Sequence, residues 1–475
     1  MPELPLSAIS IRRRALGLRM FCCNALLWGL GNGLVSTSLI VYLVGALAAG
    51  RLEKAQIGLA IGWIIAAPRL IGVLRIFTLS LIDLFESRKP VAFTAYLFSP
   101  MVLLALPLGL SSLSALAERH VNAALLTVGT IWAIYHVIEY FGTVALWGWL
   151  GDSLQARIRP LFLARRERWM IAGQFVGALV SGLWSFFLYE RLRADGELWR
   201  LYLVPTLGGI TFLIASAFPI LWIPDVRWVK ADSIAERLTR LVRPLRSRRF
   251  LAFLCFGCAL QIAGGLGQSV QSFTQMKTLG VPLLVTLALG SWTRIGQMIL
   301  AGRIGGAIRK FGHRPIAVIS LGVVSTGTLF YAWAIETSAW LIVGAATVWI
   351  GWIGVNLVIA DLTIRLAPGE DCSHGVQPVP SQKASDQRER NSLTARERKT
   401  DGTAHSSGAI AVMFTATTLA FGASSLVGGH LFDLLRESVV AIPLIERTVT
   451  FPVAMFLLVA LLRAATILFW IKRWK

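Results

Sequence analysis

The sequence is poor in charge for its length. Only 15% of its 475 residues are Asp, Glu, Lys or Arg, whereas 55% are hydrophobic. Soluble globular chains carry about 25% charged residues. The composition therefore argues against a soluble domain, and the excess apolar surface indicates that lipid is the surrounding solvent.

Histidine and cysteine are also scarce, with six His and five Cys in the chain. Cys255 and Cys258 have the C-x-x-C spacing that can signal redox or metal chemistry. They lie in an apolar run, and no second pair or histidine cluster completes a site. We interpret them as small, soft residues on a membrane helix, and we expect no metal and no cofactor.

Two catalytic motifs are missing from the sequence. It contains no G-x-x-x-x-G-K-[ST] run, which argues against an ATP-driven pump. It also lacks clustered carboxylates of the D-x-x-x-D type, with which membrane-embedded enzymes hold a metal or pyrophosphate. We therefore expect a protein that is not an enzyme.

The net charge of +21 could suggest a nucleic acid partner. However, the arginines stand in short clusters between apolar runs, and no soluble nucleic-acid module is recognisable. This pattern is typical of membrane topology, so we expect no nucleic acid partner.

Apolar runs of the length needed for a membrane helix, about 20 residues, recur along the whole chain. Twelve segments qualify: 20–49, 57–82, 91–116, 122–150, 169–189, 201–223, 250–275, 280–300, 315–335, 338–362, 408–432 and 448–471. Because helices satisfy their own backbone in lipid, the sequence predicts an all-α integral membrane protein with twelve transmembrane helices.

The basic residues predict how these helices are oriented. With the N-terminus in the cytoplasm, 33 of the 46 Lys and Arg fall in cytoplasmic segments, nine in outer loops and four within helices. This asymmetry predicts a multi-pass inner-membrane protein with both termini in the cytoplasm.

A basic break divides the chain into two sets of six helices. We expect an N-terminal bundle over 1–223, a basic cytoplasmic connector over 224–249 and a C-terminal bundle over 250–475. Apolar residues recur at helical spacing in the connector, which predicts an amphipathic helix along the anionic inner leaflet. Residues 366–407 are polar and poor in aromatic residues, so we expect a disordered cytoplasmic loop there.

Short echoes indicate that the two halves are parallel repeats. The first helix of each half contains Gly-Leu-Gly followed by a carboxamide, Asn32 in one half and Gln268 in the other. The fourth helix of each half ends in an aspartate followed by arginine, with Asp152 before Arg157 and Asp361 before Arg365.

Two loops resemble motifs of the major facilitator superfamily. Residues 305–314 resemble the loop motif G-x-x-x-D-[RK]-x-G-[RK]-[RK], with Arg309 in place of the acidic residue and Arg314 at a basic position. The loop after the second helix keeps the acidic residue, Asp83, but lacks the glycines. Residues 151–160 resemble a pattern of bacterial members, G-D-x-x-P-x-x-x-R-G, in which Asp152 and Arg159 match.

The resemblance implies two parallel six-helix bundles and transport by alternating access. Our hypothesis for these loops is a latch in which Asp83 and Asp152 pair with Arg88, Arg157 or Arg159 in the outward-open state. Arg309, Arg314 and Asp361 are the corresponding gating candidates of the second half. The alternative is that these charges only solvate helix ends and set the orientation.

In the resembled fold the first, fourth, seventh and tenth helices line a central cavity. Polar residues on those helices are costly in lipid, so we expect them to face water or protein. The candidates for substrate binding or coupling are Asn32, His136, Glu139, Gln261, Gln268 and Asn356.

His136 and Glu139 are three residues apart and so share one helix face. A titratable pair of this kind can move a proton near neutral pH, and we hypothesise that Glu139, assisted by His136, couples proton movement to the solute. The alternative is a neutral structural hydrogen-bond pair between helices.

Arg69 and Arg294 occupy the second helix of each half. Two facing guanidiniums would suit a carboxylate or phosphate, and both residues are candidates for substrate binding. The alternative is an intramembrane ion pair, for example with Glu139.

Together the residues predict a secondary active transporter that moves a small solute across the inner membrane, with protons as a candidate coupling ion and the lipid bilayer as its surroundings. We expect a monomer. A transporter-like membrane sensor or assembly factor that carries nothing is the alternative.

Overall fold

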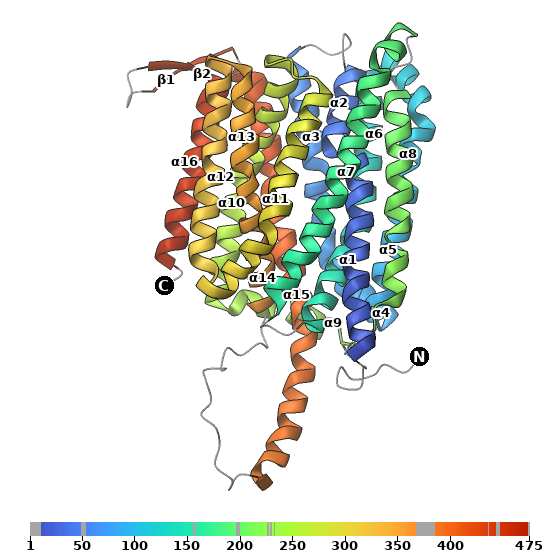
Figure 1. Cartoon of the computed structure of the whole chain (residues 1–475), viewed down its shortest axis with the longest axis vertical. Helices are drawn as coiled ribbons and strands as arrows, with labels where there is room; N and C mark the ends of the chain where they lie inside the picture. The colour runs from blue at the N-terminus through green and yellow to red at the C-terminus, as the bar shows by residue number, and fades with distance from the viewer. Residues whose placement is uncertain are drawn as a thin grey trace.

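The structure is a computed structural model, and the part of the chain that it describes is almost entirely helical (Figure 1). It describes residues 11–48, 54–154, 158–195, 200–225, 228, 230–231, 233–366, 385–435, 437–442 and 447–473. Within these ranges, eleven segments are long and apolar enough to cross a membrane.

The N-terminal half consists of helices that cross the bundle singly or as two helices in line. In chain order they are α1 (Ile11–Leu34), α2 (Thr37–Ala48), α3 (Lys54–Ile71), the 3-10 turn η2 (Gly72–Phe77), α4 (Thr78–Phe85), α5 (Arg88–Leu103), α6 (Ala105–Ser153), α7 (Arg159–Ala194), α8 (Arg200–Ala215) and the 3-10 turn η3 (Phe218–Trp222).

One of the eleven segments, Arg88–Ser153, contains two crossings. Its 66 residues would extend roughly 100 Å as one straight helix, about three times the hydrocarbon thickness. The helix is broken at His120, where φ is −143° and ψ is 72°. Beyond this break the chain runs back, so that the hydroxyl of Thr143 lies 3.4 Å from that of Tyr96. The described helices therefore make the twelve crossings that the apolar runs predict.

The C-terminal half repeats this arrangement. Its elements are α10 (Arg248–Phe273), the π-helical turn η5 (Thr274–Thr278), α11 (Leu283–Phe311), α12 (His313–Glu336), the 3-10 turn η6 (Ala339–Leu341), α13 (Ile342–Val348), the 3-10 turn η7 (Trp349–Gly351), α14 (Trp352–Arg365), α15 (Ser385–Leu435), β1 (Val439–Ile442), β2 (Arg447–Thr450) and α16 (Phe451–Arg473).

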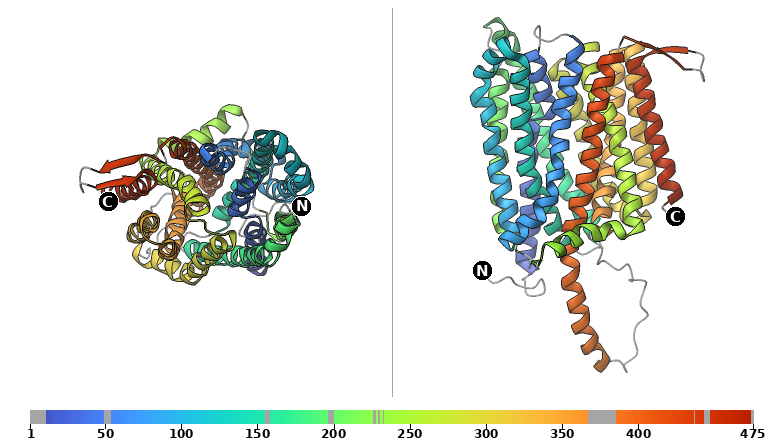
Figure 2. Two further views of the ribbon diagram at one scale, coloured as in Figure 1. Left: turned by 90° about the horizontal axis from the view of Figure 1, so that it is seen from above. Right: turned by 180° about the vertical axis from the view of Figure 1, so that it is seen from behind.

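The two halves stand side by side (Figure 2). Across the interface, α3 packs against α15, and α7 packs against α11. The predicted fold class, twelve helices in two six-helix bundles, is confirmed.

The Gly-Leu-Gly echo has a structural counterpart in both halves. A Cβ atom on Gly29 of α1 would lie 2.2 Å from the carbonyl oxygen of Met170 in α7. A Cβ atom on Gly265 of α10 would lie 2.3 Å from the carbonyl oxygen of Phe421 in α15. In each half, therefore, the first crossing approaches the fifth at the same glycine of the triplet, and any larger residue would force the two backbones apart.

The connector contains the amphipathic helix α9 (Ile234–Val242) and the 3-10 turn η4 (Arg243–Arg246). Ile234 and Leu238 are exposed on one face of α9, whereas Arg240 is buried on the other. Ser233 caps the helix, since its hydroxyl accepts a hydrogen bond from the Glu236 backbone N–H at 3.1 Å. The amphipathic pattern in the sequence thus corresponds to a helix that lies at one end of the bundle (Figure 1).

Two segments differ from the sequence-based expectations. Residues 385–407, which we expected to be disordered, form the beginning of α15. This stretch contains four Arg, two Glu and two Ala, which favour helix, and it continues a membrane helix that is already formed. The remaining part of the predicted loop, 367–384, lies outside the described residues. The antiparallel hairpin of β1 and β2 was not predicted, although β-branched Val and Thr dominate its strands.

The halves touch at both ends of the bundle. We call the end that carries α9 and the start of α1 the basic end. There Gly151 lies against Ile364, and Val144 shares an apolar cluster with Ile410 of the other half. At the opposite end, the Tyr42 hydroxyl donates a hydrogen bond to the carbonyl oxygen of Val281 at 2.6 Å. The two halves are therefore in contact at both ends.

Candidate functional site

Charged side chains gather in the middle of the bundle, where α3 and η2 of one half meet α15 of the other. We call Arg69, Arg75, His136, Glu139 and Tyr140 the interface cluster. All five belong to the second and fourth crossings of the N-terminal half. A charged group at this depth is costly unless it has a partner or a polar cavity, so the cluster is a candidate site.

Arg75 links the two halves. Its side chain is 5% exposed, and its guanidinium carbon lies 3.4 Å from the centre of the Tyr140 ring. Its Nη1 donates hydrogen bonds to the Phe414 carbonyl oxygen and to the Thr418 hydroxyl, both at 3.2 Å, on α15. A charge-assisted bond of this kind holds α15 to η2 across the interface.

Glu139 is the acidic member of the cluster. It is 5% exposed, and its Oε1 accepts a hydrogen bond from the Thr143 hydroxyl at 2.9 Å. The Nδ1 of His136 lies 3.5 Å from the other carboxylate oxygen, which is a charge-pair distance, but within the described part of the chain it makes no hydrogen bond. The spacing of three residues therefore brings the two groups together as predicted, on the buried side of α6.

Arg69 points toward the other half without an ion pair recorded in the described structure. Its guanidinium carbon lies 5.0 Å from the centre of the Phe421 ring on α15. The alternative reading, an ion pair between Arg69 and Glu139, is not among the salt bridges of the described residues.

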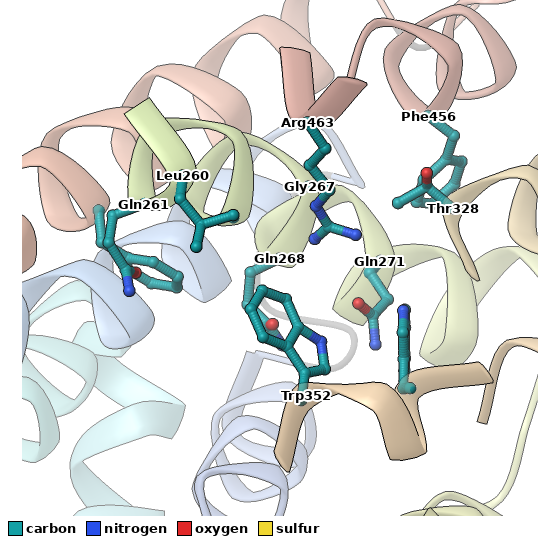
Figure 3. A pocket seen from close by; sticks show the side chains of 12 residues that line it. Leu260, Gln261, Gly267, Gln268, Gln271, Thr328, Trp352, Phe456 and Arg463 are labelled. Atoms are coloured by element: carbon teal, nitrogen blue, oxygen red, sulfur yellow. The ribbon is translucent and has the colours of Figure 1, made fainter. Parts of the chain in front are cut away.

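A separate cavity of about 160 Å³ lies inside the C-terminal half. Figure 3 shows it between α10, α14 and α16, with the Arg463 side chain extending into it. Three glutamines on one face of α10, Gln261, Gln268 and Gln271, line it together with Trp352. Arg463 is 5% exposed and lies with its guanidinium carbon 5.4 Å from the centre of the Trp352 ring.

One aromatic ring joins the cavity to the interface cluster. Phe421 lines the cavity, and the same ring lies under the guanidinium of Arg69. The cavity and the Arg69 guanidinium thus lie on either side of one side chain.

The structure brings together only part of the predicted set. Arg69, His136 and Glu139 share the interface cluster, and Gln261 and Gln268 share the cavity. Asn32 is half-buried on α1 and Asn356 is exposed on α14, and neither lines the cavity.

The predicted pairing of Arg69 with Arg294 is not observed in the described residues. Arg294 is half-buried on α11, where a Cβ atom added to Gly290 would lie 4.0 Å from its Nη1. The two arginines lie on helices that meet different partners, α15 for one and α7 for the other. The sequence repeat predicts that the two arginines have equivalent positions in the two halves. It does not determine which way each side chain points from its helix, and the two do not face each other.

Arg75 and Arg463 were the residues that sequence reasoning undervalued. Both were visible as charges inside predicted membrane helices, and that rarity was the available signal. Their roles depend on which way each side chain points, which a hydropathy pattern does not give.

Among the gating candidates, Asp83 forms contacts that differ from the predicted latch. Asp83 is 1% exposed and pairs with Arg237 of the connector at 2.8 Å, not with Arg88 or Arg159. Its Oδ1 also accepts a hydrogen bond from the Trp228 indole N–H at 2.7 Å. The connector folds back over the end of α4, which carries Asp83. The buried Asp83 carboxylate therefore anchors the connector.

An exposed pair lies beside this anchor. Lys230 donates a hydrogen bond to Glu86 at 2.7 Å, and this bond lowers the pKa of the Glu86 carboxyl. Because both side chains are largely in water, the pair adds little to stability.

Asp152 pairs with Arg88, as the latch hypothesis allowed. Its counterpart in the second half is Asp361, which lies 2.6 Å from the His313 Nε2 and 2.7 Å from the Arg365 Nε. In both halves the aspartate that ends the fourth crossing therefore meets the residue that begins the third. These pairs tie helices together within one half.

The remaining gating candidates are dispersed. Arg159 is buried and donates a hydrogen bond to the Leu154 carbonyl oxygen at 3.4 Å. Arg314 donates to the Ile471 carbonyl oxygen at 3.0 Å, and Arg309 is exposed. Arg157 lies outside the described residues.

Comparisons by sequence find no relative: no protein-family model matches the chain, and no curated protein matches it. Solved structures, by contrast, match along nearly its whole length. The human organic anion transporter MFSD10 (TETRAN) matches at a TM-score of 0.55 with 12% identity, over 96% of this chain and 97% of that one.

Two further transporters match equally well. A mutant of the nucleoside transporter NupG has a TM-score of 0.57 and 13% identity, covering 97% of this chain and all 100% of its own. The proton:xylose symporter XylE, bound to 6-bromo-6-deoxy-D-glucose, has a TM-score of 0.55 and 13% identity, over 97% and 96% of the two chains. At such identities the likeness is one of fold, and the chain has the fold of major facilitator transporters.

Proposed function

We propose that this protein is a secondary active transporter that moves a small solute by alternating access, coupled to protons through Glu139. The observation that supports this proposal most directly is the buried Glu139 carboxylate beside His136, in the same cluster as the arginine that bridges the two halves. A carboxylate in that place can change its charge at the surface along which the halves must move.

The coupling follows from the charges. Glu139 and Arg75 attract each other electrostatically, and Arg75 at the same time bonds to α15. When Glu139 takes up a proton, it loses its attraction for Arg75, and the arginine must satisfy its charge elsewhere. Protonation therefore changes the relative free energies of arrangements in which η2 and α15 are apart or together.

The membrane orientation is part of the proposal. The basic end carries most of the Lys and Arg that lie outside the apolar runs, so we place it in the cytoplasm, with both chain termini on that side of the inner membrane. The exposed apolar face of α9 would then rest on the inner leaflet, between its flanking arginines. We propose that the protein acts as a monomer, because each half finds its interface partner within the chain.

The neighbouring structures differ in what their names say they carry, namely organic anions, nucleosides and xylose. The fold alone therefore does not select a solute. The choice has to come from the side chains of this chain.

Proteoliposomes that contain a pH-sensitive dye test the proposal. Addition of carboxylates, nucleosides and sugars one at a time should produce a solute-dependent pH change inside wild-type vesicles. Glu139→Gln should lose at least tenfold in this proton flux but retain exchange of solute down its own gradient. Glu336→Gln, at the end of α12, is the matched control.

Two outcomes would contradict the proposal. A proton flux that Glu139→Gln leaves unchanged would remove the coupling role. If no solute class moves in either mode, the protein belongs to the transporter-like sensors.

A further inference from the structure

The cavity of the C-terminal half has a positive charge and no acidic side chain to balance it. Among the residues that line it in the described structure, Arg463 is the charged one, and the others are amides, aromatic rings, aliphatic residues, glycine and threonine. Arg463 lies on α16, the twelfth crossing, far along the chain from the interface cluster.

Arg463 is poorly satisfied by the protein itself. Its Nη1 donates one long hydrogen bond, 3.4 Å, to the Val324 carbonyl oxygen, and its Nε has no hydrogen-bond partner among the described residues. The side chain is only 5% exposed, so it is withdrawn from bulk water. A guanidinium has five N–H donors, and burying it inside a membrane domain is costly unless an anion completes the site.

The walls of the cavity indicate which chemical group the ligand carries besides its negative charge. The Trp352 ring lies beside the Arg463 guanidinium, at 5.4 Å from its centre, and the Phe456 and Phe421 rings add further apolar surface. Flat aromatic walls favour a flat apolar group, which gains from offset or edge contacts. Gln268 and Gln271 supply amide donors and acceptors next to these rings (Figure 3).

The volume of the cavity and its single positive charge restrict the size and charge of the ligand further. A cavity of about 160 Å³ is smaller than the ~300–1,000 Å³ of sites for drug-sized ligands. One cation balances one negative charge, whereas a phosphate monoester carries about −1.5 to −2 near neutral pH.

We propose that this cavity binds a small aromatic monocarboxylate, with its carboxylate on Arg463 and its ring against Trp352. The inference deepens the proposed function, since it names the solute class, and it rests on that function for the step from binding to transport. Binding itself requires no proton gradient and no movement of the halves.

Isothermal titration of the full-length protein in detergent tests the inference with four probes. Benzoate should bind at least tenfold more tightly than benzamide, which has the same shape without the charge, and than the cation benzylamine. Acetate, which has the charge without the ring, should also bind more weakly. Equal affinities for benzoate and benzamide, or no benzoate binding up to ~10 mM, would overturn the proposal.

Variants then assign the two parts of the site. Arg463→Met should weaken benzoate binding at least tenfold, and Arg463→Lys should restore only part of it, because lysine lacks the planar fork. Arg294→Met is the matched control, since it removes a membrane arginine that does not line the cavity, and it should leave benzoate binding unchanged. Unchanged benzoate binding by Arg463→Met would refute the assignment.

A second variant serves if Arg463→Met does not fold. Trp352→Leu keeps the charge and removes the ring wall, so benzoate should bind about threefold more weakly while acetate is unaffected. An equal loss for benzoate and acetate would argue against ring stacking. Binding without proton-coupled flux would leave this site standing while the proposed function fails, and flux of other solutes without benzoate binding would do the reverse.

Discussion

Arg75 donates a hydrogen bond from its Nη1 to the hydroxyl of Thr418 at 3.2 Å, and this bond joins the second crossing to the eleventh. The two residues are 343 positions apart in the chain and belong to different halves. The bond crosses the interface between the halves, so in the alternating access proposed above it would form in one arrangement and break in another.

Arg75→Met should loosen α15 at this point. The variant removes two hydrogen bonds to a charged group and the stacking on Tyr140, which together amount to about 2–4 kcal/mol. Hydrogen exchange in the α15 segment around Phe414 should accelerate by at least tenfold, with little change in α12. Arg309→Met, an exposed arginine at the end of α11, is the control, and equal protection in both variants would contradict the bridging role.

The close approach of α10 to α15 predicts a stability effect at Gly265. A Cβ atom there would lie 2.1 Å from the Ser424 Oγ and 2.3 Å from a backbone carbonyl oxygen, so Gly265→Ala requires the helices to shift. We expect a loss of about 1–3 kcal/mol in unfolding free energy. Gly306→Ala on α11, where nothing lies within 4 Å, should stabilise the helix slightly instead. Thermal unfolding in detergent compares the two.

Asp83 should control how firmly the connector is held. Asp83→Asn leaves Arg237 without its charge partner and weakens the bond from Trp228, for a cost of about 1–3 kcal/mol. Brief trypsin digestion should then cut the connector several times faster than in the wild type. Glu86→Gln removes the neighbouring exposed pair and should hardly change the rate, and matching rates for the two variants would remove the anchor role.

Tyr42 should favour closure of the end opposite α9. Tyr42→Phe removes the hydrogen bond to the Val281 carbonyl, worth about 1 kcal/mol, and so shifts the balance about fivefold toward separation at that end. Spin labels at Arg119 and Trp340, which are exposed on the two halves, should report more long distances. Tyr189→Phe, at an exposed site, is the control, and an unchanged distance distribution for Tyr42→Phe would contradict the prediction.

The crossings could be read from the sequence because lipid imposes one strong rule, about 20 apolar residues per helix. The ends of the helices could not. Helix α7 begins at Arg159 and α15 at Ser385, because basic and polar helix formers extend a membrane helix beyond the hydrocarbon. Hydropathy identifies only the part of each helix that lies within the hydrocarbon.

The site was predictable where one helix carries both partners. His136 and Glu139 could be paired from their spacing, since residues three apart share a face whatever the fold. The contacts of Arg75 with α15 and of Asp83 with the connector could not be derived, because they depend on the rotation and packing of separate helices. The predicted pair of Arg69 and Arg294 failed for the same reason.

Phe421 gives the two sites a common wall, since one side of its ring belongs to the cavity and a guanidinium lies against it from the neighbouring half. A ligand that displaces the Phe421 ring also changes the contact between this ring and Arg69, although the ligand itself touches no titrating group. If a ligand in the cavity changes the affinity for protons by some factor, protonation must change the affinity for the ligand by the same factor. In the proposed transporter, Phe421 would thus couple solute binding to proton binding.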